Sequence, residues 1–398
     1  MTKLSSIADY VTDKISSNDI ALREYVTTDC ILQNKKGREI ATNLPPQSCC
    51  LTRYQRGDVL IANIRPYLKK VWFADIDGGA SSDVLVFRAK EGHSPSFLYA
   101  VLLQDSFFDY VMQGAKGSKM PRGDKEQILR YEMPTLSCSE ESIGTFFLNL
   151  DQKIRLNEQI NQNLEAMAKQ LYDYWFVQFD FPNEEGKPYK SSGGEMLWND
   201  KLKRNIPVGW HCGNLFEIAV FTNGLACQKF RPKDDEVPLP VIKIREMHDG
   251  ISVDTEEVTS NIPESVKVYN GDVLFSWSAS LEVMLWAYGL GGLNQHIFKV
   301  TSANDFPKSF YYFQLLDYVD VFKKMAEARK TTMGHITQDH LQQSTIAIPD
   351  NKDIADKFEE LISPIFKQIV KLQEEISNLI KQRDELLPLL MNGQITIE

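Results

Sequence analysis

The sequence predicts an α+β protein in which two similar α/β domains form a tandem repeat, separated by two long helices that form an antiparallel coiled coil. Near the end of the chain, apolar residues recur at alternating steps of four and three from Phe358 to Leu390, the heptad spacing of a coiled-coil seam. The same spacing occurs 215 residues earlier, from Ile143 to Trp175. Similar strand and helix signals precede both stretches. These three observations indicate a duplicated unit of one domain and one helix.

The first long helix is expected over residues 140–182, and the second, with a short tail, over residues 352–398. A single amphipathic helix of this length cannot bury its apolar stripe alone, so the two helices are expected to pack on each other within the chain. A coiled coil that serves for dimerisation is the alternative.

Polar residues and prolines interrupt the heptad pattern. Asn157, Asn161 and Arg383 occupy seam positions, which lowers stability but can set the register and orientation of paired helices. Pro364 and Pro388 fall within the second helical stretch. Because proline removes a helical hydrogen bond, we expect a kink or a late start near Ser363 and a fraying end at Leu387.

The first domain is expected over residues 1–139 and mixes strand and helix signals. The expected elements are strands over residues 59–64, 71–74, 83–88 and 128–133, a turn at Gly78 and Gly79, and a helix over residues 96–112. A turn at Gly57 leads into the first of these strands. A glycine-rich basic loop, residues 114–124, lies between the helix and the last strand.

A linker over residues 183–206, rich in Gly, Pro, Ser and Lys, leads to the second domain, residues 207–351. The segment Tyr269-Asn-Gly-Asp-Val-Leu-Phe matches Tyr54-Gln-Arg-Gly-Asp-Val-Leu-Ile with a one-residue slip at the glycine. The elements expected after it are strands over residues 286–288 and 295–300, a turn over 289–292 between them, and a helix over 309–328.

Composition limits the class of protein. The 398 residues are 43% hydrophobic and 25% charged, which suits a soluble chain of two or more domains. No stretch reaches the ~18 apolar residues of a membrane span, and the N-terminus lacks the apolar core of a signal peptide. A cytoplasmic location is therefore expected. The net charge of −10 argues against a general polyanion binder, so any nucleic-acid contact must come from local basic patches.

Catalytic motifs are incomplete. Asn43-Leu-Pro-Pro departs from the Asn-Pro-Pro-aromatic signature of adenine methyltransferases at Leu44 and Gln47. The glycines and Lys119 of the basic loop lack the spacing of a phosphate-binding loop, and His335 and His340 lack the glutamate of a zincin. Neither catalysis nor a metal site is therefore expected.

Several segments resemble one known family. The longest is residues 169–196, which includes Tyr-Asp-Tyr-Trp-Phe-Val-Gln-Phe-Asp-Phe-Pro; the others are residues 63–70, 119–124, 203–210 and 224–232. Together they resemble the DNA-specificity (S) subunits of type I restriction–modification systems, over the whole length of the chain.

This resemblance implies a non-catalytic subunit with two target recognition domains, each reading one half of a split double-stranded DNA sequence. It implies that the coiled coil spaces these domains and docks two methyltransferase (M) subunits, with restriction (R) subunits as possible further partners and no membrane. It places S-adenosylmethionine and ATP with Mg²⁺ on those partners, so no cofactor is expected on this chain.

The candidate DNA contacts are basic, amide or hydroxyl side chains in irregular segments or at strand ends. In the first domain they are Asn63, Arg65, Lys69, Lys70, Lys116, Ser118, Lys119 and Arg122. In the second domain they are Gln228, Lys229, Arg231, Lys243, Arg245, Arg329, Lys330, Thr331 and Thr332.

Two other functions stay open. A coiled-coil adaptor that binds protein and not DNA would fit the acidic balance of the chain. A methyltransferase with an unusual active site would have to bind S-adenosylmethionine as an isolated chain, which we do not expect.

Overall fold

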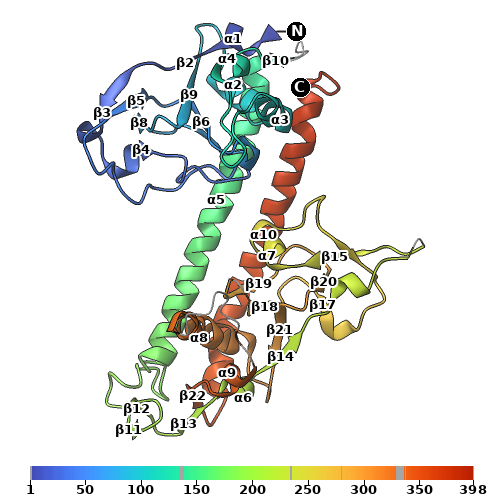
Figure 1. The fold of residues 1–398 in the computed structure, drawn as a ribbon. Helices are drawn as coiled ribbons and strands as arrows, with labels where there is room; N and C mark the ends of the chain where they lie inside the picture. The colour runs from blue at the N-terminus through green and yellow to red at the C-terminus, as the bar shows by residue number, and fades with distance from the viewer. Residues whose placement is uncertain are drawn as a thin grey trace. The chain divides into compact units, whose positions relative to one another are not determined.

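The chain folds into two compact units, which the computed structural model describes at residues 2–133, 139–233, 235–278, 280–328, 336 and 338–397. Unit 1 comprises Met1–Arg155 and Leu379–Glu398, and unit 2 comprises Leu156–Asn378. Each unit contains one α/β domain and parts of both long helices (Figure 1). The domain boundaries expected from the sequence stay a prediction, because the division into units cuts through both helices.

Unit 1 is built on two four-stranded sheets. The first has the order β2 (Ala8–Tyr10), β9 (Val84–Ala89), β6 (Val59–Ala62), β7 (Val71–Phe73), all antiparallel. The second has the order β3 (Lys14–Ser16), β5 (Cys50–Tyr54), β8 (Gly78–Ala80), β4 (Tyr25–Val26), with β4 parallel to β8. The helices are α1 (Leu4–Ile7), α2 (Pro95–Leu102), α3 (Asp105–Gln113) and α4 (Lys125–Ile128), and β1 (Thr2–Lys3) pairs with β10 (Glu132–Met133).

Both faces of the first sheet are covered. Along β6, Val59 and Ile61 pack in a core with α2 and α3, whereas Leu60 packs in a second core with residues of the other sheet. Every residue of this strand is buried. That accounts for the continuous apolar run Val-Leu-Ile-Ala, since a strand covered on both faces needs no polar side.

Unit 2 repeats the strand order of the first sheet, but the fourth strand of its second sheet lies at the opposite edge. Its first sheet is β14 (Ala219–Asn223), β21 (Ile297–Ser302), β18 (Val273–Ser276), β19 (Glu282–Leu285). Its second is β16 (Glu257–Val258), β15 (Leu239–Ile242), β20 (Gly291–Leu293), β17 (Lys267–Val268), with β15 parallel to β20. The other elements are α6 (Leu215–Ile218), α7 (Ile244–Asp249), α8 (Lys308–Ala328), α9 (Gln338–Gln342), the β11–β12 hairpin (Met196–Asn199, Arg204–Pro207), and β13 (Trp210–Gly213) paired with β22 (Ile346–Pro349).

The turn that leads into the central strand shows the duplication at atomic detail. Gly57 and Gly271 have left-handed φ angles of 93° and 86°, which glycine adopts without strain. Asp58, which follows Gly57, pairs with Arg88 of β9 at 2.7 Å. Asp272, which follows Gly271, pairs with Lys299 of β21 at 2.8 Å. The two segments therefore form the same turn, although one is a residue shorter before the glycine.

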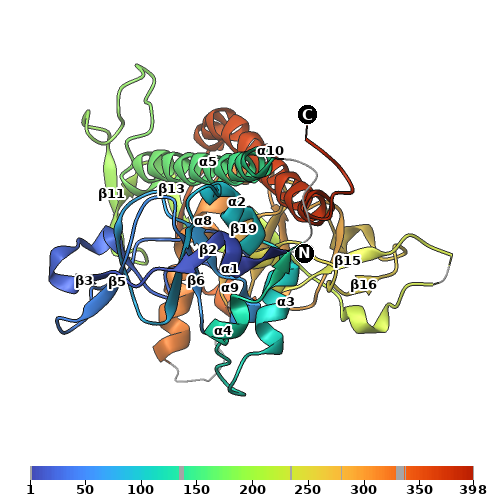
Figure 2. The same cartoon turned by 90° about the horizontal axis from the view of Figure 1, so that it is seen from above.

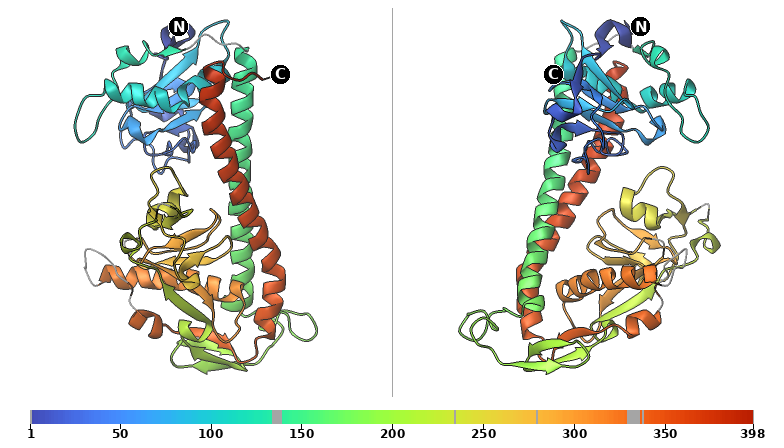
Figure 3. Two further views of the ribbon diagram at one scale, coloured as in Figure 1. Left: turned by 90° about the vertical axis from the view of Figure 1, so that its right-hand side faces the viewer. Right: turned by 60° about the vertical axis from the view of Figure 1, so that its left-hand side comes forward.

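The long helices α5 (Glu140–Tyr172) and α10 (Asp353–Met391) lie side by side and antiparallel within each unit (Figures 2 and 3). In unit 1 the start of α5 packs against the end of α10, through Ile143, Phe147, Leu387 and Leu390. In unit 2 the end of α5 packs against the start of α10: Ala168 and Tyr172 share a core with Phe358 and Ile362. All of these residues are buried, and six of them lie at heptad positions, as predicted. Tyr172 and Leu387 are buried although they lie outside the heptad spacing. A π-helical turn, η4 (Asp173–Val177), follows α5.

The polar seam positions are buried as well. Asn161 donates from Nδ2 to the carbonyl oxygen of Ile369 at 3.3 Å. Arg383 is 3% exposed and donates from Nη1 to Oδ1 of Asp151, which is also 3% exposed, at 3.1 Å. The hydroxyl of Tyr99 on α2 donates to the other oxygen of Asp151. A buried ion pair thus replaces apolar packing at one layer of the seam in unit 1.

Some expected elements were wrong. Gly78 and Gly79 form strand β8 and not a turn. The helix expected over residues 96–112 is two helices, because Gln104 is extended and its side chain donates to the carbonyl of Val101 at the end of α2. The strand expected over residues 128–133 is the end of α4 followed by β10, and β19 ends at Leu285, before the expected strand 286–288.

The prolines do not interrupt the second long helix. α10 continues from Asp353 to Met391, so the late start near Ser363 and the fraying end at Leu387 are wrong. The alternative, a kink near Ser363, stays a prediction. Pro364 and Pro388 are both exposed. The carbonyl groups four residues earlier, which lose their helical partners, can therefore bond to water.

Candidate nucleic-acid interface

Five of the predicted DNA contacts of the first domain come together at one edge of unit 1. Isolated β-bridges join Ile64 to Arg122 and Lys116 to Arg122, which closes the basic loop and sets it beside the chain that follows β6. The backbone N–H of Arg65 donates to the carbonyl of Pro121 at 2.8 Å. The side chains of Arg65, Lys116, Ser118, Lys119 and Arg122 are all exposed.

These exposed cations differ in their surroundings. Lys116 pairs with Asp124 at 3.0 Å, and Arg122 pairs with Asp83 at 3.1 Å. Because of the hydrogen bond from Lys116, the pKa of Asp124 lies below its usual value. Within the described residues, Arg65 and Lys119 have no side-chain hydrogen bond or ion pair. These two charges are thus the ones most available to a polyanion.

The other three predicted residues of this domain are buried or paired inside unit 1. Asn63 is 9% exposed, and its buried Oδ1 atom has no hydrogen-bond partner in the described part of the chain. Lys69 pairs with Asp105 at 2.8 Å, and Lys70 donates from Nζ to the carbonyl of Thr28 at 2.6 Å. The geometry favours a supporting role for these three side chains over a direct contact with DNA.

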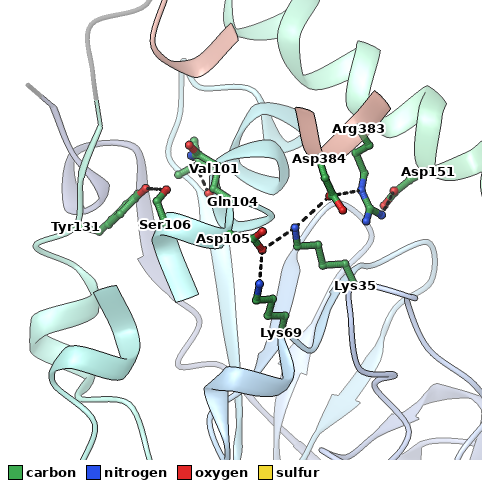
Figure 4. A network of polar contacts seen from close by, with 10 residues as sticks. All are labelled: Lys35, Lys69, Val101, Gln104, Asp105, Ser106, Tyr131, Asp151, Arg383 and Asp384. Carbon is green, nitrogen blue, oxygen red and sulfur yellow. Dashed lines mark hydrogen bonds and ion pairs between the residues drawn. The ribbon is translucent and has the colours of Figure 1, made fainter. Parts of the chain in front are cut away.

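Sequence reasoning missed the cation that joins this region to α10. Lys35 lies in the long connection between β4 and β5, and its side chain is 5% exposed. Its ammonium group lies 2.9 Å from Asp105 and 3.2 Å from Asp384 of α10 (Figure 4). Burial alone would raise the pKa of Asp105, but hydrogen bonds and charges from Lys35 and Lys69 lower it. No pattern around Lys35 indicated burial, because the connection has no periodicity.

The basic window of the second domain gathers around Glu256. Lys243, the residue before α7, pairs with Glu256 at 2.6 Å. That hydrogen bond lowers the pKa of Glu256, and the positive charges of Arg231 and Arg245 lower it further. Arg245 also pairs with buried Glu246 at 2.7 Å. Gln228 and Lys229 are exposed on a 3-10 turn, η5 (Cys227–Lys229), just before Arg231.

The remaining candidates, Arg329, Lys330, Thr331 and Thr332, lie outside the described residues. Within the described part of the chain, no group of three or more His, Cys, Asp or Glu side chains is arranged to hold a metal ion. None of the described helices is both long and apolar enough to cross a membrane.

Comparison with known proteins shows which proteins this chain resembles. A sequence model of the type I restriction modification DNA specificity domain matches residues 207–382. The specificity subunit of the type I restriction enzyme MjaIX from Methanocaldococcus jannaschii is 23% identical over 397 residues, covering 96% of this chain and 87% of that protein. The chain is thus similar to type I restriction–modification specificity subunits along nearly its whole length.

Two further proteins are similar to this chain over nearly its whole length. The specificity subunit of the HindI enzyme from Haemophilus influenzae is 23% identical over 441 positions, which include 93% of this chain and 94% of the relative. The crystal structure of the type I S subunit from M. genitalium superposes with a TM-score of 0.59 over 98% of this chain and 95% of that one, at 12% identity. That likeness shows the shared fold of tandem domains and long helices.

Proposed function

We propose that this chain is a specificity subunit that reads a split, two-part DNA site, with each α/β domain recognising one half. The observation that carries the proposal is the duplication: the two domains share the strand order of their first sheet and one glycine turn, and each is followed by a long helix. Two copies of one reading unit, joined by a helical spacer of fixed length, suit two sequence elements separated by a non-specific spacer.

The contacts to DNA are assigned to the two exposed basic clusters. In the first domain these are Arg65, Lys119 and the partly neutralised Lys116 and Arg122; in the second they are Lys229 and Arg231 with the residues around Glu256. Since the net charge is −10, electrostatic attraction is local, and the affinity for DNA decreases steeply as salt increases.

An outer stripe of α5 and η4 is the proposed docking surface for methyltransferase subunits. The stripe consists of Leu156, Ile160, Met167 and Tyr174, which are 52%, 37%, 49% and 38% exposed. Their steps of four, seven and seven residues place them on one side of the helix, away from the buried seam. A continuous row of exposed apolar side chains fits a helical partner.

The chemistry of the complex belongs to the partner subunits in this proposal. S-adenosylmethionine binds the two methyltransferase subunits, and ATP with Mg²⁺ binds the restriction subunits where these are present. This chain supplies the choice of DNA site and the positions of its partners.

Sequencing of modified adenines in the host genome tests the proposal. We expect methylation at a split sequence in the presence of the gene and none at that sequence after its deletion. In electrophoretic binding, the chain with its methyltransferase partner should shift a duplex carrying the split site at lower concentration than a scrambled duplex. A chain that binds the partner but leaves the modification pattern unchanged on deletion would be a protein-binding adaptor instead.

The docking surface has a separate test. Met167→Glu places a charge in the outer stripe and should weaken co-purification of the methyltransferase subunit by at least about tenfold. Gln162→Glu, an exposed change on the same helix outside the stripe, is the matched control. Equal loss in both variants, or in neither, would rule out the stripe as the docking surface.

A further inference from the structure

In the first sheet, which the two domains share, the connection between the last two strands differs in length. In unit 1, residues 63–70 join β6 to β7 and include a 3-10 turn, η3 (Pro66–Leu68). In unit 2, residues 277–281 join β18 to β19, a connection three residues shorter. Two domains that read different half-sites must read bases with segments that differ, because the shared framework cannot distinguish the sequences.

The backbone at the start of this turn is held in place. Arg65 and Lys69, which flank η3, both have left-handed φ angles, of 54° and 50°. Non-glycine residues adopt this region only when the surrounding structure holds them there. Here the N–H of Arg65 donates to Pro121 at 2.8 Å, and the N–H of Leu68 donates to the carbonyl of Arg65 at 2.9 Å.

The side chain of Arg65 is left free on this fixed turn. Its guanidinium group has no ion pair within the described residues, whereas Lys116 and Arg122 beside it have acidic partners. Arginine can donate two parallel hydrogen bonds to O6 and N7 of guanine in the major groove. Such readout needs a head group free to bind and a backbone that cannot shift, and Arg65 meets both conditions.

Lys35 holds the turn against α10. The N–H groups of Asn34 and Lys35 donate to the carbonyls of Leu68 and Lys69 at 2.9 and 3.0 Å. The buried ammonium group of Lys35 then bridges Asp105 and Asp384 (Figure 4). Lys35 therefore joins the η3 turn through its backbone N–H, and α3 and the end of α10 through its side chain.

In unit 2, the contact between the long helix and the neighbouring helix of the domain is a direct ion pair, without a third side chain between them. Lys169 of α5, 215 residues before Asp384, pairs directly with Asp317 of α8 at 2.8 Å. In unit 1 the helix residue and its neighbour on α3 are both acidic, so a third, cationic side chain must lie between them. Lys35 supplies this cation from the same connection that supports the Arg65 turn.

We propose that Arg65 reads a guanine in the half-site of the first domain, and that Lys35 is a positioning residue that fixes the Arg65 turn to α10. The inference rests on the proposed function and extends it to one base contact and its support. Arg65 determines specificity at one base pair of one half-site, while the second half-site is read independently.

Arg65→Lys tests the base contact, because it keeps the charge and removes the two parallel donors. The full-length variant, with its methyltransferase partner, replaces the wild type in a host that lacks the gene, and the methylated adenines are sequenced. We expect the preference for guanine at one position of one half-site to decrease roughly 10- to 100-fold, with the other half-site unchanged. Lys119→Ala is the matched control, expected to weaken binding to all sequences equally and to reduce its salt dependence.

Lys35→Met and Lys35→Arg test the positioning role. Lys35→Met should relax the same base position as Arg65→Lys, and Lys35→Arg should restore part of the preference because it keeps a bridging cation. Thermal unfolding of each variant is measured in parallel. A purely structural Lys35 would lower stability and reduce overall methylation without relaxing that one position.

The outcomes separate the inference from the proposed function. If the wild type gives no split methylated site, the proposed function fails. If the wild type gives one and Arg65→Lys leaves every position unchanged, or weakens all positions equally, Arg65 does not read a base and the inference is overturned. If Arg65→Lys relaxes a position that Lys35→Met does not, the positioning role of Lys35 is overturned.

Discussion

The Arg383–Asp151 pair forms a charged layer in the coiled-coil seam, and both of its members have further hydrogen-bond partners. Asp151 accepts hydrogen bonds from Arg383 and Tyr99, and Arg383 also donates from Nε to Asp384 at 3.1 Å. Burial raises the pKa of the Tyr99 hydroxyl, so this group stays a donor at any physiological pH. A buried ion pair contributes little net stability, but losing one partner leaves an uncompensated charge.

Arg383→Met should therefore destabilise the protein by about 3 kcal/mol, because buried Asp151 loses its nearer cation and keeps only Arg155, at 3.7 Å. Lys381→Met on the same helix removes an exposed cation 3.9 Å from Glu385 and should cost less than about 0.5 kcal/mol. Chemical denaturation of both variants measures the free energies of unfolding to be compared. Equal effects would show that the charge of Arg383 is solvated rather than buried. The double variant Asp151→Leu with Arg383→Met should recover most of the loss.

His211 on β13 joins two acidic side chains of unit 2. Its Nδ1 lies 2.5 Å from Asp350, and its Nε2 lies 3.2 Å from Glu217. Burial would lower the pKa of His211, but the hydrogen bonds and charges of Asp350 and Glu217 outweigh burial and raise it. The protonated form is thus favoured in the folded state.

The stabilisation by His211 should be present at low pH and disappear at high pH. A folded-state pKa above the unfolded value of ~6.5 gives a contribution that is complete below that value and lost as pH rises through the folded pKa. His211→Gln should lower the free energy of unfolding by at most about 0.5 kcal/mol near pH 5.5, since His211 is 46% exposed, and by nothing near pH 9. Urea denaturation of both proteins at the two pH values measures this. A loss of unfolding free energy in His211→Gln that increases with pH would contradict a raised pKa of His211.

Among the elements, β8 departs most clearly from its sequence pattern. Gly78 and Gly79 look like a turn, yet they lie in a strand between β5 and β4. A Cβ atom on Gly78 would lie 2.1 Å from the carbonyl oxygen of Glu24 and 2.5 Å from the hydroxyl of Tyr54. Glycine is needed here because another backbone approaches closely, which is a second use of glycine that a local pattern cannot separate from a turn.

Gly78→Ala should destabilise the first domain by at least about 2 kcal/mol, because the clash is with backbone and cannot be relieved by a rotamer change. Gly92→Ala is the control: it has a positive φ of 88° but no atom within 4 Å, so only backbone strain of about 1 kcal/mol is expected. Comparison of the thermal unfolding of the two variants separates the cost of the steric clash from the cost of backbone strain. If Gly92→Ala costs as much as Gly78→Ala, close approach is not what requires Gly78.

The elements also show where sequence reasoning succeeds. The heptad spacing predicted the seam of α5 and α10, because packing of two helices depends on periodicity that is local in sequence. It marked Arg383 as an exception but not Asp151 as its partner, 232 residues away. For the interface, the sequence predicted which segments carry free cations, such as Arg65. It could not predict that Lys69 and Lys70 are occupied, since their partners Asp105 and Thr28 belong to distant segments.

At the scale of the whole molecule, both long helices continue through the boundary between the units, at residues 155–156 of α5 and 378–379 of α10. If the helices space the two reading domains, their length sets the distance between the two half-sites.

Insertion of one heptad at both of these points should lengthen the spacer of the methylated site while both half-sites stay unchanged. Seven residues add ~10 Å of helix, which corresponds to roughly 3 base pairs. Sequencing of modified adenines gives the spacer directly. Insertion into one helix alone is the control, and should abolish modification because the seam loses register. An unchanged spacer with the double insertion would refute a spacing role for the helices.

The division of unit 1 into two separate segments has a consequence for synthesis on the ribosome. Its core needs Leu387, Leu390 and Met391 as well as Ile143 and Phe147, whereas unit 2 is continuous from Leu156 to Asn378. At ~5–20 residues per second, the first domain therefore waits on the order of ten to fifty seconds for the segment that completes its core. The part of the protein made first is finished last, and until then the apolar start of α5 is exposed to solvent or to chaperones.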